Sequence, residues 1–433
     1  MLTLIEELDL FGEPIIYKGK KNTDCTFIDN LSLPVHKWYR YTAGFSALWV
    51  REIIQREKLN GRTNIIEPFA GSGTVLLESK FCNVKAIGIE AHPFVSRIAK
   101  AKLHWDVNLR DFQSYAFSIL EQAKQCKSSE TKYPSLIERC FSTSTLTCLD
   151  ALRKTYYDNI DNSAISDLTF LALIAVLRKS LSAKTTQQYV FPNKFKEKKV
   201  DPFEIFKEQI FMMSKDLSIL QKLTYSSSED VILFQDDARN CNCIPDQWGD
   251  LVITSPPYAN NYDYADATRL ELSFLGEIEG WGDLQEKVRN YLVRSCTQHV
   301  SSLVKETYDI INDPILSIIK DEMTTVCQNL ETEKEHHGGK KNYHTMIASY
   351  FYDMAKAWIA LRRVTKENSL VGFVIGDSAP YGIYVPVEKW LGELALAAGF
   401  KSYTFEKTRD RNIKWKNRKH KVPLQEGYLW VNG

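Results

Sequence analysis

The sequence predicts an α/β protein in which seven strands form one sheet, interrupted by two largely helical insertions. Between residues 64 and 107, two short β-prone runs alternate with helical patterns, an order that requires parallel pairing of the strands. The strand pattern returns after residue 230 and again after residue 368. The long stretches between these parts have the 3.6-residue periodicity of helices.

The strands follow one another in a regular order. The first is Asn64–Phe69, with a glycine turn and a helix behind it, and the second is Lys85–Glu90, with a helix from about 92 to 107. The third and fourth are Asp230–Gln235 and Asp250–Ser255. The last three are expected in "SLVGFVIGDS", "KSYTFEKTR" and "GYLWVNG", with the amphipathic helix "PVEKWLGELALAAG" after the first of them.

We therefore divide the chain into three parts. Residues 1–110 hold an N-terminal segment and the first half of the sheet, and residues 111–225 form the first helical insertion. Residues 226–433 complete the sheet and contain the second helical insertion at about 280–345. The helices expected in the first insertion are Leu146–Tyr157, Ile165–Leu181 and Phe203–Leu223.

Composition excludes several classes of protein. The net charge is +1, so any nucleic-acid binding must come from local basic patches. The nine cysteines form no paired framework, and Cys241 with Cys243 lacks a second pair at zinc-site spacing, so we expect reduced thiols and no metal. No apolar run approaches the roughly 18 to 20 residues of a membrane span, and the acidic N-terminus is unlike a signal peptide. A cytoplasmic location without membrane partners is expected.

Ligand-suited residues follow the first three strands. In "EPFAGSGT" (Glu67–Thr74), Gly71 and Gly73 allow a ligand to approach the backbone closely. Glu90 ends the next strand, where an acid can accept hydrogen bonds from ribose hydroxyls, and Asp236 or Asp237 can reach an adenine amino group. The segment lacks the third glycine of a dinucleotide fingerprint and the lysine of a phosphate loop. A glycine turn with helix-capping acids is the alternative.

The fourth strand stops abruptly at "SPPY" (Ser255–Tyr258), because two prolines have no N–H for a ladder. This segment and "EPFAGSGT" resemble motifs IV and I of the S-adenosylmethionine-dependent DNA amino-methyltransferases, and "HKWYRYTAGFS" (His36–Ser46) resembles their motif X. The chain is most similar to the cytosine-N4-specific branch, with its Ser-Pro-Pro-Tyr signature. The similarity extends from about His36 to the C-terminus, with both helical insertions excepted.

The resemblance implies a Rossmann-like methyltransferase sheet and a cofactor site. Phe69, Gly71 and Gly73 would line the methionine moiety of S-adenosyl-L-methionine, Glu90 would bind the ribose and Asp237 the adenine; S-adenosyl-L-homocysteine would be the product. The full predicted cofactor set is Tyr41, Phe45, Glu67, Pro68, Phe69, Ala70, Gly71, Ser72, Gly73, Thr74, Glu90, Ala91, Asp236, Asp237, Ala238 and Ser255.

The chemistry of an exocyclic amine explains the catalytic residues Ser255, Pro256, Pro257 and Tyr258. Its lone pair is delocalised into the ring, so the site must hold the nitrogen with acceptors. The prolines fix φ and pre-organise the Ser255 and Pro256 carbonyls, while Tyr258 offers a flat face to a flipped base. Termination of a strand is the alternative role. The sequence contains no Pro-Cys dipeptide, which excludes C5 methylation.

Two basic segments are candidates for DNA contact. "TTQQYVFPNKFKEKK" lies in the first insertion, between motifs I and IV, where target recognition is expected; a solvated loop is the alternative. Lys407–Lys421 carries eight Lys or Arg against one Asp. The residues predicted to contact duplex DNA are Gln187, Gln188, Lys194, Lys196, Lys198, Arg409, Arg411, Lys414, Lys416 and Arg418. "HHGGKKNYH" is interpreted as a glycine hinge that touches DNA.

Three functions remain open from the sequence. The first is a DNA cytosine-N4 methyltransferase, solitary or paired with a restriction endonuclease; a DNA adenine-N6 enzyme is its nearest variant, because base choice rests chiefly on Ser255. The second is an RNA enzyme of the tRNA guanine-N2 type. The third is a non-catalytic nucleic-acid-binding subunit. For the loop after the motif, Tyr262, Asp263 and Tyr264 either extend the base pocket or cap and pack the next helix.

Overall fold

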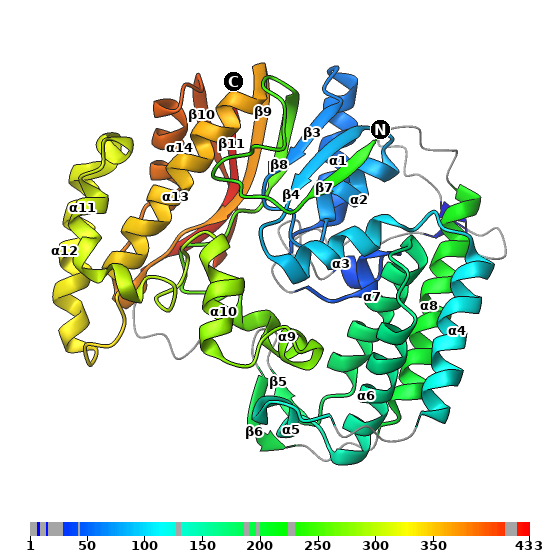
Figure 1. Cartoon of the computed structure of the whole chain (residues 1–433). Helices are drawn as coiled ribbons and strands as arrows, with labels where there is room; N and C mark the ends of the chain where they lie inside the picture. Colours follow the sequence, from blue (N-terminus) through cyan, green and yellow to red (C-terminus); the bar gives the residue numbers. More distant parts are fainter. Residues whose placement is uncertain are drawn as a thin grey trace.

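The computed structural model describes residues 7–8, 14–15, 29–41, 44–126, 131–185, 190–195, 200–223, 230–411 and 422–433. A single seven-stranded sheet forms its centre, as predicted (Figure 1). The strands are β3 (Asn64–Glu67), β4 (Lys85–Ile89), β7 (Val231–Phe234), β8 (Gly249–Thr254), β9 (Thr365–Gly376), β10 (Ser402–Arg411) and β11 (Leu424–Asn432). Their spatial order is β10-β11-β9-β8-β3-β4-β7.

The pairing directions bring particular strand ends together. β7, β4, β3, β8 and β9 all run parallel to one another, whereas β11 is antiparallel to both β9 and β10. β3 therefore lies between β4 and β8, and all three strands run in the same direction. Because the carboxyl ends of parallel strands meet at one edge, the segments after β3, β4 and β8 share that edge.

Side chains alternate between two cores on the two faces of the sheet. Ile65 of β3 belongs to the core with α1 (Ala47–Leu59), α2 (Thr74–Phe81) and α3 (Pro93–Leu103). Its neighbour Ile66 belongs to the core with α13 (Tyr343–Val364) and α14 (Val387–Ala397). Burial on both faces explains why these strands read as nearly continuous apolar runs in the sequence. The helices fix the sheet from both sides and leave its edges for the loops.

The first insertion is a helical bundle with a small hairpin. Its helices are α4 (Leu109–Gln125), α5 (Ser135–Glu138), α6 (Thr143–Asp158), α7 (Ala164–Lys179) and α8 (Pro202–Leu223). It lies beside α3 (Figure 1), where Phe170 of α7 meets Phe94 edge-on. The segment expected to contact DNA or to form a solvated loop contains an antiparallel pair, β5 (Ala183–Thr185) and β6 (Val190–Phe195), in which Val190 and Phe191 favour an extended chain.

The second insertion is a run of short helices between β8 and α13. It comprises η3 (Asp266–Thr268), α9 (Arg269–Leu275), α10 (Trp281–Lys287), η4 (Arg289–Tyr291), η5 (Ser301–Glu306), α11 (Thr307–Ile311), η6 (Pro314–Ile319) and α12 (Lys320–His336). Smaller elements are β1 (Glu7–Leu8), β2 (Pro14–Ile15), η1 (Asp29–Leu31), η2 (His36–Trp38) and η7 (Pro380–Gly382). None of the helices in the described ranges has the length and apolar character needed to cross a membrane.

Candidate active site

The turn after β3 places two glycines in the left-handed region of backbone space. Gly71 has a φ of +52° and Gly73 a φ of +84°, conformations that glycine adopts without strain. The backbone N–H of Ala70 donates to Ile89 O at 2.8 Å, which ties the turn to the end of β4. A Cβ at Gly71 would lie 3.3 Å from Tyr41 Cε1. The missing side chain thus keeps a narrow space open between the turn and the Tyr41 ring.

Glu67 caps the helix that follows this turn. Gly73 is the N-cap residue of α2 and has no side chain to offer, so the free N–H groups need another acceptor. The Glu67 carboxylate accepts from Val75 N at 3.3 Å and from Leu76 N at 3.2 Å. The residue is fully buried, and this burial raises the pKa of its carboxyl well above the usual range. Glu67 therefore supports the glycine turn from the buried side.

Glu90 joins the ends of β3 and β4. One carboxylate oxygen accepts from Gly71 N at 2.7 Å and the other from His92 N at 2.8 Å. Burial raises the pKa of Glu90 to about 7, although the two backbone hydrogen bonds oppose the shift. An ionised carboxylate has about four acceptor positions, so it keeps capacity for two ligand hydroxyls. The geometry suits the ribose role that was predicted for Glu90.

The segment His36–Tyr41 forms a strap between the sheet domain and the first insertion. Lys37 Nζ and Trp38 Nε1 both donate to the buried carboxylate of Asp216 on α8, at 2.7 and 2.8 Å. On the other side, His36 Nε2 lies 2.8 Å from Glu78 Oε1 of α2. These contacts on both sides hold the strap so that Tyr41 lies against the glycine turn. Phe45, also predicted for the cofactor, is 5% exposed and lies against Trp49 within the core.

The acids after β7 are already engaged. Both oxygens of Asp237 accept from Arg239 Nε at 2.9 Å, and Arg239 Nη1 also lies 3.4 Å from Asp353 Oδ1. Asp236 accepts from the N–H groups of Asp237 at 2.8 Å and Cys243 at 3.1 Å. The pair is thus fixed at the carboxyl end of β7, with one charge neutralised by an arginine that the sequence analysis did not single out.

Ser-Pro-Pro-Tyr begins where β8 ends at Thr254. Ser255 Oγ donates to Val374 O of the neighbouring β9 at 3.2 Å. The N–H of Tyr258 donates to Tyr264 Oη at 3.3 Å. One residue on, the Ala259 carbonyl accepts from Ser378 Oγ, so the segment is held from both sides. The strand stop predicted from the prolines is therefore a turn with fixed partners.

Tyr41 is the point at which these parts converge. Burial raises its pKa well above the usual range, and negative charge on Glu90, Tyr262 or Tyr264 would raise it further, because these groups lie close to it. Tyr262 and Tyr264 are themselves in edge contact, with ring centroids 4.5 Å apart. The strap, the end of β4 and the loop after Ser-Pro-Pro-Tyr thus meet at one edge of the sheet.

In the loop after the motif, Asp263 has the capping and packing role that the sequence left open. Asp263 caps η3 by accepting from the N–H groups of Ala265 and Asp266, both at 3.2 Å, and it forms a buried ion pair with Arg289 at 2.6 Å. The base-pocket role that the sequence also left open for Tyr262 and Tyr264 stays a prediction. The sequence alternates acids and tyrosines here, so it gives no signal that distinguishes the role of Asp263 from the roles of the tyrosines.

His92 is a site residue that sequence reasoning missed. Its Nε2 lies 2.7 Å from Thr268 Oγ1, and that hydroxyl donates to Ala265 O, so the imidazole is the donor. Burial lowers the pKa of His92 to about 3, which keeps it neutral. It therefore connects the end of β4 to η3 without adding charge. Its position two residues after Glu90 was the one available signal.

The structure describes three of the predicted DNA-contacting residues. Lys194 is exposed on β6, with Nζ 5.7 Å from the Phe191 ring centroid. Arg409 and Arg411 both pair with Glu426 of β11, at 2.8 and 3.4 Å. The remaining seven lie outside the described residues: Gln187, Gln188, Lys196, Lys198, Lys414, Lys416 and Arg418. Most of the proposed DNA surface thus keeps its status as a prediction.

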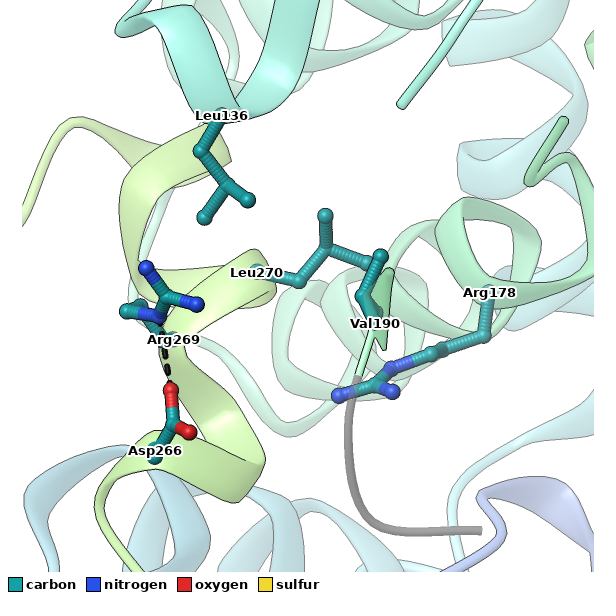
Figure 2. A pocket seen from close by; sticks show the side chains of 6 residues that line it. All are labelled: Leu136, Arg178, Val190, Asp266, Arg269 and Leu270. Carbon is teal, nitrogen blue, oxygen red and sulfur yellow. Dashed lines mark hydrogen bonds and ion pairs between the residues drawn. The ribbon is translucent and has the colours of Figure 1, made fainter. Parts of the chain in front are cut away.

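A small pocket lies between the first insertion and α9 (Figure 2). The Asp266–Arg269 ion pair, with 2.7 Å between Oδ1 and Nε, forms part of its wall. None of the residues predicted for cofactor, catalysis or DNA lines it; its walls are Leu136, Arg178, Val190, Asp266, Arg269 and Leu270. Within the ranges given above, no group of three or more His, Cys, Asp or Glu side chains is placed to hold a metal ion.

The seven-stranded sheet, with β11 antiparallel between β9 and β10 and helices on both faces, has a Rossmann-like methyltransferase fold. The chain is similar to the Type II methyltransferase M.BsoBI of Geobacillus stearothermophilus, with 24% identity over 99% of this chain and 89% of that protein. It is also similar to the Type II methyltransferases M.AvaI of Nostoc sp. (strain PCC 7120) and of Anabaena variabilis. Each is 27% identical over 87% of this chain and 81% of its own. No family model and no solved structure matches the chain.

Proposed function

We propose that this protein is an S-adenosyl-L-methionine-dependent DNA methyltransferase that modifies the N4 amine of a flipped cytosine in duplex DNA. The observation that carries the proposal is the shared edge of β3, β4 and β8. There Glu90 accepts from the glycine turn, the Tyr41 ring lies against that turn, and Tyr264 holds the backbone of Tyr258. Similarity to proteins named Type II methyltransferases, over nearly the whole chain, supports the same class.

The residues at this edge fit the cofactor. Gly71 and Gly73 leave the space that a side chain would fill, and Glu90 offers acceptor positions for the ribose. Asp236 and Asp237 lie at the end of β7, on the far side of β4 from the turn, where the adenine would extend. The sulfonium supplies an electrophilic methyl group. Phe69, partly buried after β3, would cover the methionine side.

Ser255, Pro256 and Tyr258 would hold the base. The carbonyls of Ser255 and Pro256 lie in a segment whose φ angles the prolines restrict, so they can accept from an amine without reorganising. Acceptors on both amine hydrogens favour a pyramidal nitrogen with its lone pair directed at the methyl group. Tyr258 would stack on the base, and its backbone is held by the hydrogen bond to Tyr264.

Duplex DNA is the substrate that the basic segments support. Lys194 on the β5–β6 hairpin and Arg409 near the C-terminal end of β10 are both exposed. Phosphate contacts of this kind supply most of the affinity and make it dependent on salt. Because the similar proteins carry Type II names, a partner restriction endonuclease in the same system is part of the proposal.

The test is transfer of labelled methyl groups from S-adenosyl-L-methionine to duplex DNA by the purified protein, followed by nucleoside analysis. We expect N4-methylcytosine. N6-methyladenine would replace the base assignment and leave the rest standing, whereas label on RNA alone would favour an RNA enzyme. Tyr258→Ala should lose methyl transfer and keep cofactor binding, and Tyr258→Phe, which keeps the ring, should retain most of the activity. Loss of cofactor binding in both variants would contradict the assigned roles.

A further inference from the structure

Arg411 lies against the ring of Tyr258, although the two residues come from distant strands. The guanidinium carbon is 5.3 Å from the ring centroid, within the range of a cation–π contact. Tyr258 follows β8, whereas Arg411 is the last residue of β10, and β9 and β11 separate these strands in the sheet. The arginine therefore reaches across the ends of two strands to meet the motif.

The position of Arg411 is fixed by contacts that leave its side chain only 17% exposed. Nη1 donates to Asp377 O at 2.7 Å, and Nε lies 3.4 Å from Glu426 Oε2. Glu426 is itself 5% exposed and binds Arg409 through its other oxygen. Arg409 shares the Glu426 carboxylate but leaves 42% of its side chain exposed, whereas Arg411 is also bound by the Asp377 carbonyl, which leaves much less of it free for a phosphate.

Gly376, the last residue of β9, makes room for this guanidinium. A Cβ built there would lie 2.6 Å from Arg411 Nη1 and 3.1 Å from its Cδ. Both atoms belong to a flexible side chain, so an alanine would displace the arginine at little cost to the backbone. Gly376 also pairs with Glu426 across the β9–β11 ladder, which places the glycine, the carboxylate and the arginine side by side.

We propose that Arg411, held by Glu426, is a positioning residue that sets the Tyr258 ring for the target base. The inference rests on the proposed function, because it assumes that Tyr258 receives a base. A guanidinium against one part of the ring restricts the rotation of the ring. The structure thus assigns Arg411 to the Ser-Pro-Pro-Tyr segment. Arg409, with 42% of its side chain exposed, is still expected to contact DNA phosphates.

The experiment uses a duplex with the recognition site found by methylome sequencing and pyrrolocytosine at the methylated position. Fluorescence without cofactor reports base extrusion, and steady-state kinetics with cofactor report kcat and KM. We expect Arg411→Met to lower kcat by about 10- to 100-fold and to reduce the extrusion signal, with DNA affinity changed less than threefold. Gly376→Ala should reproduce this effect while retaining the arginine, and Arg411→Lys should restore part of it.

The controls separate positioning from charge. Arg409→Met is expected to weaken DNA binding and its salt dependence. Lys401→Met, which removes an exposed cation just before β10, should leave extrusion, kcat, KM and DNA affinity unchanged. If Arg411→Met only weakens DNA binding, with normal kcat and extrusion, the positioning role is overturned while the proposed function stands. A wild-type protein that methylates no DNA would overturn both.

Discussion

The backbone N–H of Gly71 lies 2.7 Å from Glu90 Oε2, so one carboxylate ties the glycine turn of β3 to the end of β4. The same carboxylate is the group that we assign to the cofactor ribose. Its protonation state therefore affects both the shape of the turn and the acceptors offered to a ligand. This makes the site sensitive to pH in a defined direction.

We expect the affinity for S-adenosyl-L-methionine to rise with pH through about 7 and then to level off. The pKa of Glu90 is raised to about 7, and only the ionised carboxylate can accept from both ribose hydroxyls. Glu90→Gln should bind more weakly and without this dependence, as isothermal titration calorimetry between about pH 5.5 and 8.5 will measure. Lys102, whose pKa burial lowers to about 7, titrates in the same range, so Lys102→Met is the control. A slope that persists in Glu90→Gln and vanishes in Lys102→Met would contradict the assignment.

Gly73→Val should abolish cofactor binding. Gly73 has a φ of +84°, and a Cβ there would lie 3.3 Å from Ala99 Cβ, so the turn must move. Gly61→Val is a matched control, because Gly61 has a φ of +82° with nothing within 4 Å of its Cβ position. Both variants carry a left-handed strain of at least about 1 to 2 kcal/mol, visible in urea unfolding. Only Gly73→Val should also lose more than about tenfold in cofactor affinity; equal losses would refute a local role.

Asp216→Ala should destabilise the protein and loosen the strap. The carboxylate is 2% exposed and accepts from Lys37 and Trp38, so its removal leaves two donors without that partner. We expect a loss of about 1 to 3 kcal/mol in the free energy of unfolding. Because the strap carries Tyr41 onto the glycine turn, cofactor affinity should fall as well. Glu204→Ala, which breaks an exposed pair with Lys207 on the same helix, should cost less than about 1 kcal/mol. Unchanged cofactor affinity in Asp216→Ala would show that Tyr41 is held independently.

Asp377→Asn should become relatively more stable than the wild type as the pH rises. Burial and the neighbouring Glu388 carboxyl raise the pKa of Asp377 to about 8, so the folded state holds a proton that the unfolded chain releases near pH 4. The stabilisation from this group is complete below about pH 4 and is lost as the pH rises through about 8. Asparagine stays neutral, so unfolding curves at pH 5 and 8.5 should show a smaller decrease for the variant. Asp106→Asn, at a carboxylate with 64% exposure, is the control. Parallel curves for Asp377→Asn and the wild type would refute the shift.

The strands and the two turns were determined by local rules in the sequence. β-prone runs ending in Gly-Ser-Gly or Pro-Pro restrict φ and remove ladder donors within a few residues, so neither turn needed distant contacts to be predicted. Seven strands in one sheet followed from the same alternation. The β5–β6 hairpin was not predicted, because its runs are short and a lysine-rich loop has the same composition.

Only the tertiary structure decided which residues meet. The antiparallel insertion of β11 between β9 and β10 brings Arg411 to Tyr258 across 153 positions of the sequence. The pairing of Asp216 with the strap and of His92 with Thr268 likewise depends on helices that approach in space. A side chain's partner depends on strand order and helix packing, which are set by the burial of the whole core. Local backbone preferences act over a few residues and cannot specify it.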